Sequence, residues 1–163
     1  MIELSIMEIT KENREKVVSF FKEHWGSSEM VISTGTYQCD KLDGFIFEDN
    51  NKFIGLVTYV IKANEIEIIS LDSLQEGKGI GSALIKKVEN TAKQKKIQAV
   101  SLITTNDNLN ALKFYQKRGY RITSIIPDAV NNARKIKPSI PLIGNDGIPI
   151  EDELKLKKII LKH

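Results

Sequence analysis

The stretch SLQEGKGIGSALIKK, Ser73 to Lys87, decides the fold because a bare backbone gives way to a helix within a few residues. Gly77, Gly79 and Gly81 alternate with other residues, and from Gly79 onward apolar side chains recur at three- and four-residue steps, which predicts an amphipathic helix. A glycine-rich loop before a helix lets backbone N–H groups converge on an anion, and the helix N-terminus adds about half a positive charge. The stretch therefore predicts a phosphate site.

Two common nucleotide motifs do not fit this loop. A P-loop needs a lysine after its last glycine, whereas Lys78 precedes Gly79. The dinucleotide fingerprint that starts at Gly77 requires a glycine at Ser82 and an acidic residue after the next strand, where the sequence reads LITT. The pattern Gly77-x-Gly79-x-Gly81 is therefore expected in a different setting.

The residues before the loop predict strands. The segment GFIFEDNNKFIGLVTYVIKANEIEIISLDS contains three apolar runs, and the polar breaks EDNN and KAN predict tight turns between them. An antiparallel meander is therefore expected. Upstream, residues 2–9 predict a strand, and Thr10 is expected to cap a helix whose apolar stripe contains Val17, Val18, Phe21, His24 and Trp25.

The residues after the loop helix alternate between strands and helices. AVSLIT and YRITSII predict strands, and the helix NLNALKFYQKRG between them is expected to end at Gly119. All four prolines follow residue 126, where a helix, a turn and a last strand are expected. The chain is expected to be a single domain, 1–163, with a C-terminal flap at about 127–150 and a final strand at about 152–161.

Composition limits the possible functions. The 163 residues are 41% hydrophobic and 28% charged, and no apolar run is long enough to cross a bilayer. The N-terminus lacks the pattern of a signal peptide, so a cytoplasmic protein is expected. The single cysteine, Cys39, and the two distant histidines offer no internal disulfide and predict no metal site. The net charge of +3 comes mainly from scattered lysines, which disfavours a nucleic-acid partner.

A second motif follows the next predicted strand. The pattern Asn-x-x-Ala-x-x-Phe/Leu-Tyr-x-x-x-Gly-Phe/Tyr is matched by Asn108, Ala111, Phe114, Tyr115, Gly119 and Tyr120. With Gly79 and Gly81, it resembles the two signatures of the GNAT family of acetyl-coenzyme A-dependent N-acetyltransferases. The first signature begins with Arg or Gln, but here that position is Glu76, and Gln75 stands one place earlier. The resemblance implies an α/β (α+β) fold: a mixed, mostly antiparallel sheet, splayed between its fourth and fifth strands and flanked by helices.

The resemblance also implies a cofactor site. Acetyl-CoA is expected to place its pyrophosphate on the amides of the glycine loop, and Glu76 beside it is expected to point outward because like charges repel. The cofactor-binding residues implied are Ile69, Leu71, Gly77, Lys78, Gly79, Ile80, Gly81, Ser82, Asn108 and Ala111.

Three residues are candidates for the chemistry. The resemblance implies Tyr115 as the general acid that protonates the leaving thiolate; the alternative is a core aromatic. It suggests Glu65 as the base, and Glu67 lies on the same predicted strand face, leading toward Ile69 and Leu71. The alternative is that these glutamates face solvent or pair with lysines.

The implied activity is direct transfer of an acetyl group from acetyl-CoA to a primary amine of a small molecule or peptide. Cys39 lies outside both motifs, so no covalent cysteine intermediate is expected. His24 and Trp25 are candidates for the acceptor site, although their place on the apolar stripe of the helix favours the core. Polyamines, aminoglycosides, amino acids, peptide N-termini and lysine side chains all remain open as acceptors. The alternative function is a non-catalytic acyl-CoA-binding sensor or interaction module, and the protein is expected to be a monomer or homodimer.

Overall fold

The computed structural model describes residues 5–75 and 77–162. Glu76 and residues 2–4 of the expected first strand lie outside the described residues. The strands are β1 Ile6–Glu8, β2 Glu29–Ile32, β3 Gly35–Gln38, β4 Asp43–Asp49, β5 Lys52–Lys62, β6 Glu65–Ser73, β7 Ala99–Thr105, β8 Arg121–Ile126 and β9 Glu153–Ile159. The helices are α1 Arg14–His24, α2 Ile80–Gln94, α3 Leu109–Lys117 and α4 Ala129–Ile136, with short 3-10 helices η2 Cys39–Lys41 and η3 Asn145–Gly147.

The chain divides into two compact units, which are described separately. The first contains Met1–Glu29, Gln38–Val100 and Ile160–His163, and the second contains Met30–Tyr37 and Ser101–Ile159. In the first unit, the hydrogen-bonded strand order is β1-β4-β5-β6-β7, and in the second unit it is β7-β9-β8. Strand β7 appears in both because it begins in the first unit and ends in the second. The mixed, mostly antiparallel sheet with helices beside it confirms the expected fold class. The single domain and the splay stay predictions.

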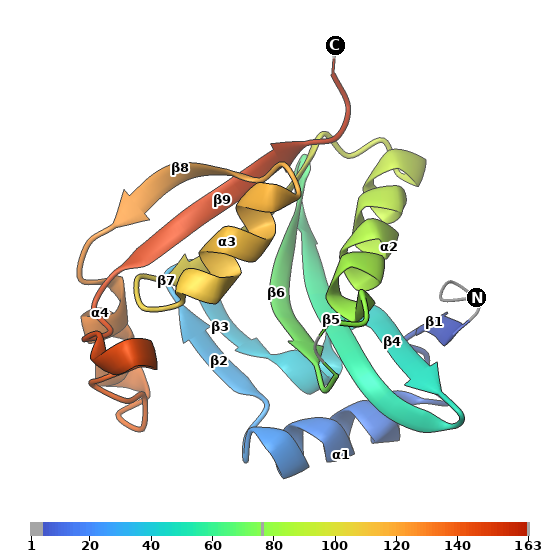
Figure 1. Cartoon of the computed structure of the whole chain (residues 1–163), viewed down its shortest axis with the longest axis horizontal. Helices are drawn as coiled ribbons and strands as arrows, with labels where there is room; N and C mark the ends of the chain where they lie inside the picture. The colour runs from blue at the N-terminus through green and yellow to red at the C-terminus, as the bar shows by residue number, and fades with distance from the viewer. Residues whose placement is uncertain (1–4, 76, 163) are drawn as a thin grey trace. The chain divides into compact units, whose positions relative to one another are not determined.

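The first unit is built on the expected meander. β4, β5 and β6 pair antiparallel in sequence order, and α2 lies along them (Figure 1). Gly55 of β5 lies directly beneath α2, since a Cβ there would come within 2.6 Å of Ile80 and 3.2 Å of Leu84. This close approach fixes the start of α2 on the sheet. The fully buried side chains of this core include Ile46, Leu56, Val57, Ile66, Leu84 and Val88.

Strand β6 contains a bulge at Ile69. Ser70 lies opposite Thr58 of β5, but the next residue of β5, Tyr59, lies opposite Ile68, so Ile69 is an extra residue. The Thr58 and Ser70 side chains lie on the same face of the sheet, where their hydroxyl oxygens are 2.5 Å apart. An extra residue reverses the alternation of side chains along a strand. Residues two apart across the bulge therefore point to opposite faces.

The bulge changes which side chains share the face of Glu65 and Glu67. Beyond the bulge, this face continues with Ser70 and Asp72. Leu71 points to the other face, on which α2 packs, so the predicted alignment of Leu71 with the two glutamates is wrong. The sheet thus presents a carboxylate from Asp72 on the face opposite α2.

Helix α1 begins later than the sequence predicts. It starts at Arg14 after Asn13, and the Thr10 N–H donates to Asn13 Oδ1 at 2.7 Å, so the predicted Thr10 cap is wrong. The helix ends at His24, and Trp25 beyond it is 62% exposed, so Trp25 is not a core residue. Val18 is also exposed. The buried stripe consists of Val17, Phe20 and Phe21.

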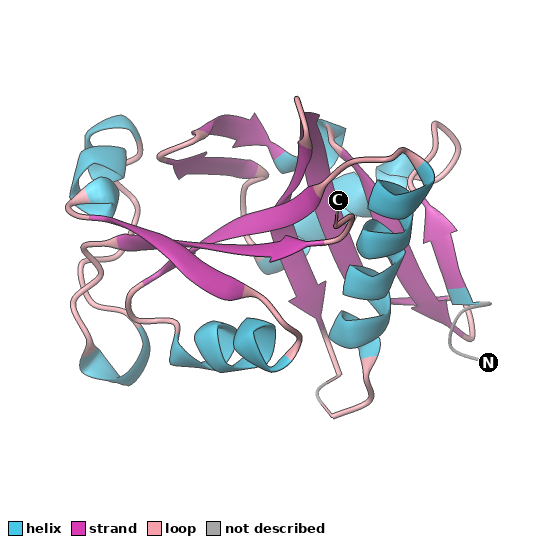
Figure 2. Ribbon diagram, turned by 90° about the horizontal axis from the view of Figure 1, so that it is seen from above, coloured by secondary structure: helices cyan, strands magenta, loops and turns pink. Residues whose placement is uncertain are grey.

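The second unit holds α3 and α4. Its strands β8 and β9 lie side by side in antiparallel register (Figure 2). Arg134 of α4 donates hydrogen bonds to the carbonyl oxygens of Ile140, Pro141 and Ile150, at 2.5 to 3.2 Å. These bonds tie together the segment predicted as a flap, so Arg134 has a structural role there.

We expect Gly55→Ala to lower the free energy of unfolding by about 1–3 kcal/mol, because the new methyl group would overlap Ile80. Ile80→Ala removes the overlapping atom, so the double variant should lose less stability than the two single losses added together. Urea unfolding of the four proteins measures this coupling. Strict additivity would show that the close approach of Gly55 to Ile80 does not matter for stability.

Candidate functional site

The glycine loop leaves backbone groups uncovered at the start of α2. Gly77 and Gly79 have φ of +75° and +72°, a conformation that favours glycine, and a Cβ at either position would meet nothing within 4 Å. The first helical hydrogen bond runs from the Ala83 N–H to the Gly79 oxygen, and no described side chain caps this end.

The side chains beside the loop differ in their surroundings. Ile80 is 3% exposed and belongs to the core, so only its backbone is available to a ligand. Lys78 is exposed and, with Gln75, lines a pocket of about 250 Å³ next to the loop. A lysine beside a helix N-terminus adds positive charge next to the loop, and Asp49 also lines this pocket. Such a loop suits a phosphorylated ligand.

The second signature forms α3 and the turn after it. Asn108 caps α3, because its Oδ1 accepts the Ala111 N–H at 3.1 Å, and its amide nitrogen is the donor that remains. Tyr115 is 7% exposed, and its ring packs edge-on against Phe114 and Tyr120, with centroids 5.1 and 5.6 Å away. The ring of Tyr115 is therefore held in one orientation by its neighbours.

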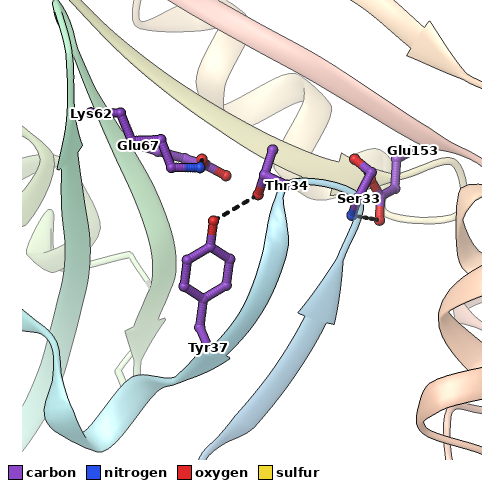
Figure 3. A network of polar contacts seen from close by, with 6 residues as sticks. All are labelled: Ser33, Thr34, Tyr37, Lys62, Glu67 and Glu153. Carbon is purple, nitrogen blue, oxygen red and sulfur yellow. Dashed lines mark hydrogen bonds and ion pairs between the residues drawn. The ribbon is translucent and has the colours of Figure 1, made fainter.

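Glu67 is a buried carboxylate with an ionic partner. It is 3% exposed, and its Oε1 accepts from Lys62 Nζ at 2.6 Å across the β5–β6 hairpin (Figure 3). Glu65 lies opposite Lys62 in the same hairpin and is half-buried. The alternative to a catalytic base was that these glutamates face solvent or pair with lysines, and Glu67 is paired with Lys62.

Asp72 is a functional candidate that the sequence analysis did not identify. Burial raises the pKa of its carboxyl to about 6, although a hydrogen bond from the Trp25 side chain and the charge of His24 oppose the rise. Its Oδ2 is buried and has no hydrogen-bond partner among the described residues. A signal was present in the sequence, since an aspartate interrupts an apolar strand just before the loop, but its face depends on the bulge.

A second buried carboxylate in the other unit was also missed. Glu153 is 1% exposed and accepts from the Ser33 backbone N–H, at 3.2 Å to each oxygen, and from Ser33 Oγ at 2.5 Å (Figure 3). The Tyr37 hydroxyl donates to Thr34 Oγ1 at 3.0 Å within the same β2–β3 hairpin. These bonds fix the hairpin turn, so we assign Glu153 a structural role. Ser33 and Glu153 are too far apart in sequence for any pattern to connect them.

The predicted site residues fall into two groups. The first group lies in the first unit: on β6 are Ile69, Leu71, Glu65 and Glu67, and the glycine loop follows that strand. His24 and Trp25, at the end of α1, belong to the same unit. Asn108, Ala111 and Tyr115 lie in the second unit. The combination of the two groups into one site stays a prediction.

A family model described as the acetyltransferase (GNAT) family matches residues 8–120, which is more than half of the chain. The chain belongs to the GNAT family of acetyltransferases. The uncharacterized protein YxbD of Bacillus subtilis is 49% identical over 156 residues, which are 95% of this chain and 98% of that protein. The family resemblance inferred from the two signatures is therefore confirmed.

Solved structures share the fold. An IAA acetyltransferase from Bacillus cereus matches with a TM-score of 0.72 at 24% identity, over 94% of this chain and 97% of its own. A GNAT family acetyltransferase from Elizabethkingia anophelis, solved with acetyl-CoA bound, matches with a TM-score of 0.66 at 20% identity, over 95% and 98%. Within the described residues, no helix has the length and apolar character needed to cross a membrane.

We expect Asp72→Asn to stabilise the protein above pH 6 by about 1–3 kcal/mol and to have little effect near pH 4. The folded pKa of about 6 exceeds the ordinary value of 3.8, so ionisation costs stability as pH rises through this interval. Asparagine removes the charge and keeps an oxygen for the Trp25 hydrogen bond. Urea unfolding at pH 4 and pH 8 measures the effect, with Asp49→Asn, at an exposed position, as control. An equal effect at both pH values would contradict the raised pKa.

Proposed function

We propose that the protein is an N-acetyltransferase that moves an acetyl group from acetyl-CoA to a primary amine. The observation that carries the proposal is the open backbone at Gly77 and Gly79, directly before α2, in a chain of the GNAT family. Converging amides and a helix N-terminus suit the pyrophosphate of the cofactor. A solved structural neighbour with acetyl-CoA bound supports the same cofactor.

The cofactor would be held mainly by backbone groups. The amides from Gly77 to Ser82 would bind the pyrophosphate, and exposed Lys78 would add a positive charge. Ile69 and Leu71 of β6 would lie along the pantetheine arm, and the amide nitrogen of Asn108 would donate to it. Ala111 would act through its position in α3, since its N–H is already taken by the cap.

Acetyl transfer needs an unprotonated amine, a polarised thioester carbonyl and a proton for the leaving thiolate. Tyr115 would supply that proton from its hydroxyl group, which is held in one place because two aromatic neighbours fix the ring. Glu65 or Glu67 would accept the proton of the ammonium, directly or through water. For Glu67 this requires the carboxylate to exchange its contact with Lys62 for the substrate.

Release of free CoA from acetyl-CoA, measured against a broad panel of amines, tests the activity. The panel should contain a polyamine, an aminoglycoside, free amino acids, a peptide with a free N-terminus and a peptide with an internal lysine. We expect at least one amine to raise CoA release well above the rate without acceptor. Tight acetyl-CoA binding with no release for any amine would instead favour the acyl-CoA-binding sensor or interaction module.

We expect Tyr115→Phe to lower kcat by about 10²- to 10⁴-fold, the usual contribution of a general acid, and to leave cofactor affinity nearly unchanged. Phenylalanine keeps the ring contacts with Phe114 and Tyr120 and loses only the hydroxyl. Tyr120→Phe is the matched control, because this ring is also buried and the second signature accepts either residue there. Parent turnover in Tyr115→Phe would remove Tyr115 as the acid.

A further inference from the structure

Asp72 combines three features that a structural carboxylate rarely shows together. It is partly buried at the end of β6, its Oδ2 makes no hydrogen bond to any described residue, and it shares the sheet face of Glu67. Buried polar atoms in folded proteins almost always have partners, and an exception suggests a water, an ion or a ligand. The site is therefore incomplete without a hydrogen-bond donor from outside the described residues.

The surroundings of Asp72 also limit what that donor can be. From α1 and the residue after it, His24 acts on the carboxyl through its charge and Trp25 donates a hydrogen bond. From β5, the residue opposite is the apolar Leu56. Along β6, Glu67 lies on the same face and is already paired with Lys62. No described lysine or arginine forms an ion pair with Asp72, so a cation from outside would be the group that neutralises it.

We propose that Asp72 binds the ammonium group of the acceptor, with the exposed Trp25 side chain beside it. This inference rests on the proposed N-acetyltransferase activity and narrows its acceptor to alkylamines that are cationic at neutral pH. Asp72 stands on the strand that leads into the glycine loop, so an ammonium held there would lie on the strand expected to contact the cofactor. Trp25 is 62% exposed and adds an aromatic face that favours cations.

The proposal can be tested without turnover, because Trp25 is the only tryptophan in the sequence and its side chain acts on the Asp72 carboxyl. Its fluorescence should therefore report ligands of Asp72. At pH 8, n-butylammonium chloride should change the fluorescence saturably, whereas n-butanol, which has the same alkyl chain without the charge, should not. At pH 5, Asp72 is largely protonated, because its pKa is about 6, so the n-butylammonium response should be lost.

Asp72→Asn should weaken n-butylammonium binding by at least about tenfold, the expected loss of one charged hydrogen bond. Asp72→Glu should restore part of the binding, because it keeps the charge. Asp40→Asn is the matched control: Asp40 Oδ1 is also buried without a described partner, but it lies on η2. Equal responses to n-butanol and n-butylammonium, or unchanged binding in Asp72→Asn, would overturn the proposal.

The same variants separate this inference from the proposed function. With an acceptor found in the amine panel, Asp72→Asn should raise the acceptor KM at least about tenfold and leave the acetyl-CoA KM unchanged. An unchanged acceptor KM would overturn the assignment of Asp72 even though the enzyme is active. If no amine releases CoA, the proposed activity fails, and the n-butylammonium titration still decides whether Asp72 binds a cation.

Discussion

The extra residue at Ile69 determines how β6 divides its side chains between two environments. A regular strand would place Leu71 on the face of Glu67 and turn Asp72 toward α2, where the core is apolar. With the bulge, Leu71 lies on the face that α2 covers and Asp72 lies near Trp25. One inserted residue thus avoids the burial of a carboxylate in a hydrophobic core, which would cost several kcal/mol. The packing of α2 and the polarity of the opposite face both depend on it.

The carboxylates on that face are stabilised in different ways. Glu67 is almost fully buried, and the ion pair with Lys62 neutralises it. Asp72 receives a hydrogen bond from the Trp25 side chain, and its raised pKa shows that this does not offset the cost of desolvation. Glu67 is therefore already neutralised, whereas no described lysine or arginine forms an ion pair with Asp72. Asp72 is thus the better suited of these two carboxylates to bind a further cation.

Sequence alone was sufficient for the parts of the fold that depend on local patterns. The tight turns EDNN and KAN predicted the meander, and the change from glycines to three- and four-residue periodicity predicted α2. The face of Asp72 could not be predicted, because a bulge does not alter the order of apolar and polar residues. The bond from Ser33 to Glu153 joins residues 120 positions apart, and no periodicity reaches that far. Trp25 was misplaced because α1 ends one residue before it.

The positions of Trp25 and Asp72 suggest why the chain keeps a carboxylate that lowers its stability at neutral pH. An exposed indole and a partly buried carboxyl with an unbonded oxygen are both unfavourable in an isolated protein. A cation that binds between them would satisfy both groups, since it would donate to Oδ2 and contact the aromatic face. Groups that are poorly satisfied in the free protein and well satisfied in a complex are typical of binding sites, where function opposes stability. The same reasoning applies to the loop, where the backbone is open at Gly77 and Gly79. Both features lie on one continuous segment from β6 to α2, so a single stretch of chain would hold the acceptor cation at one end and the cofactor anion at the other.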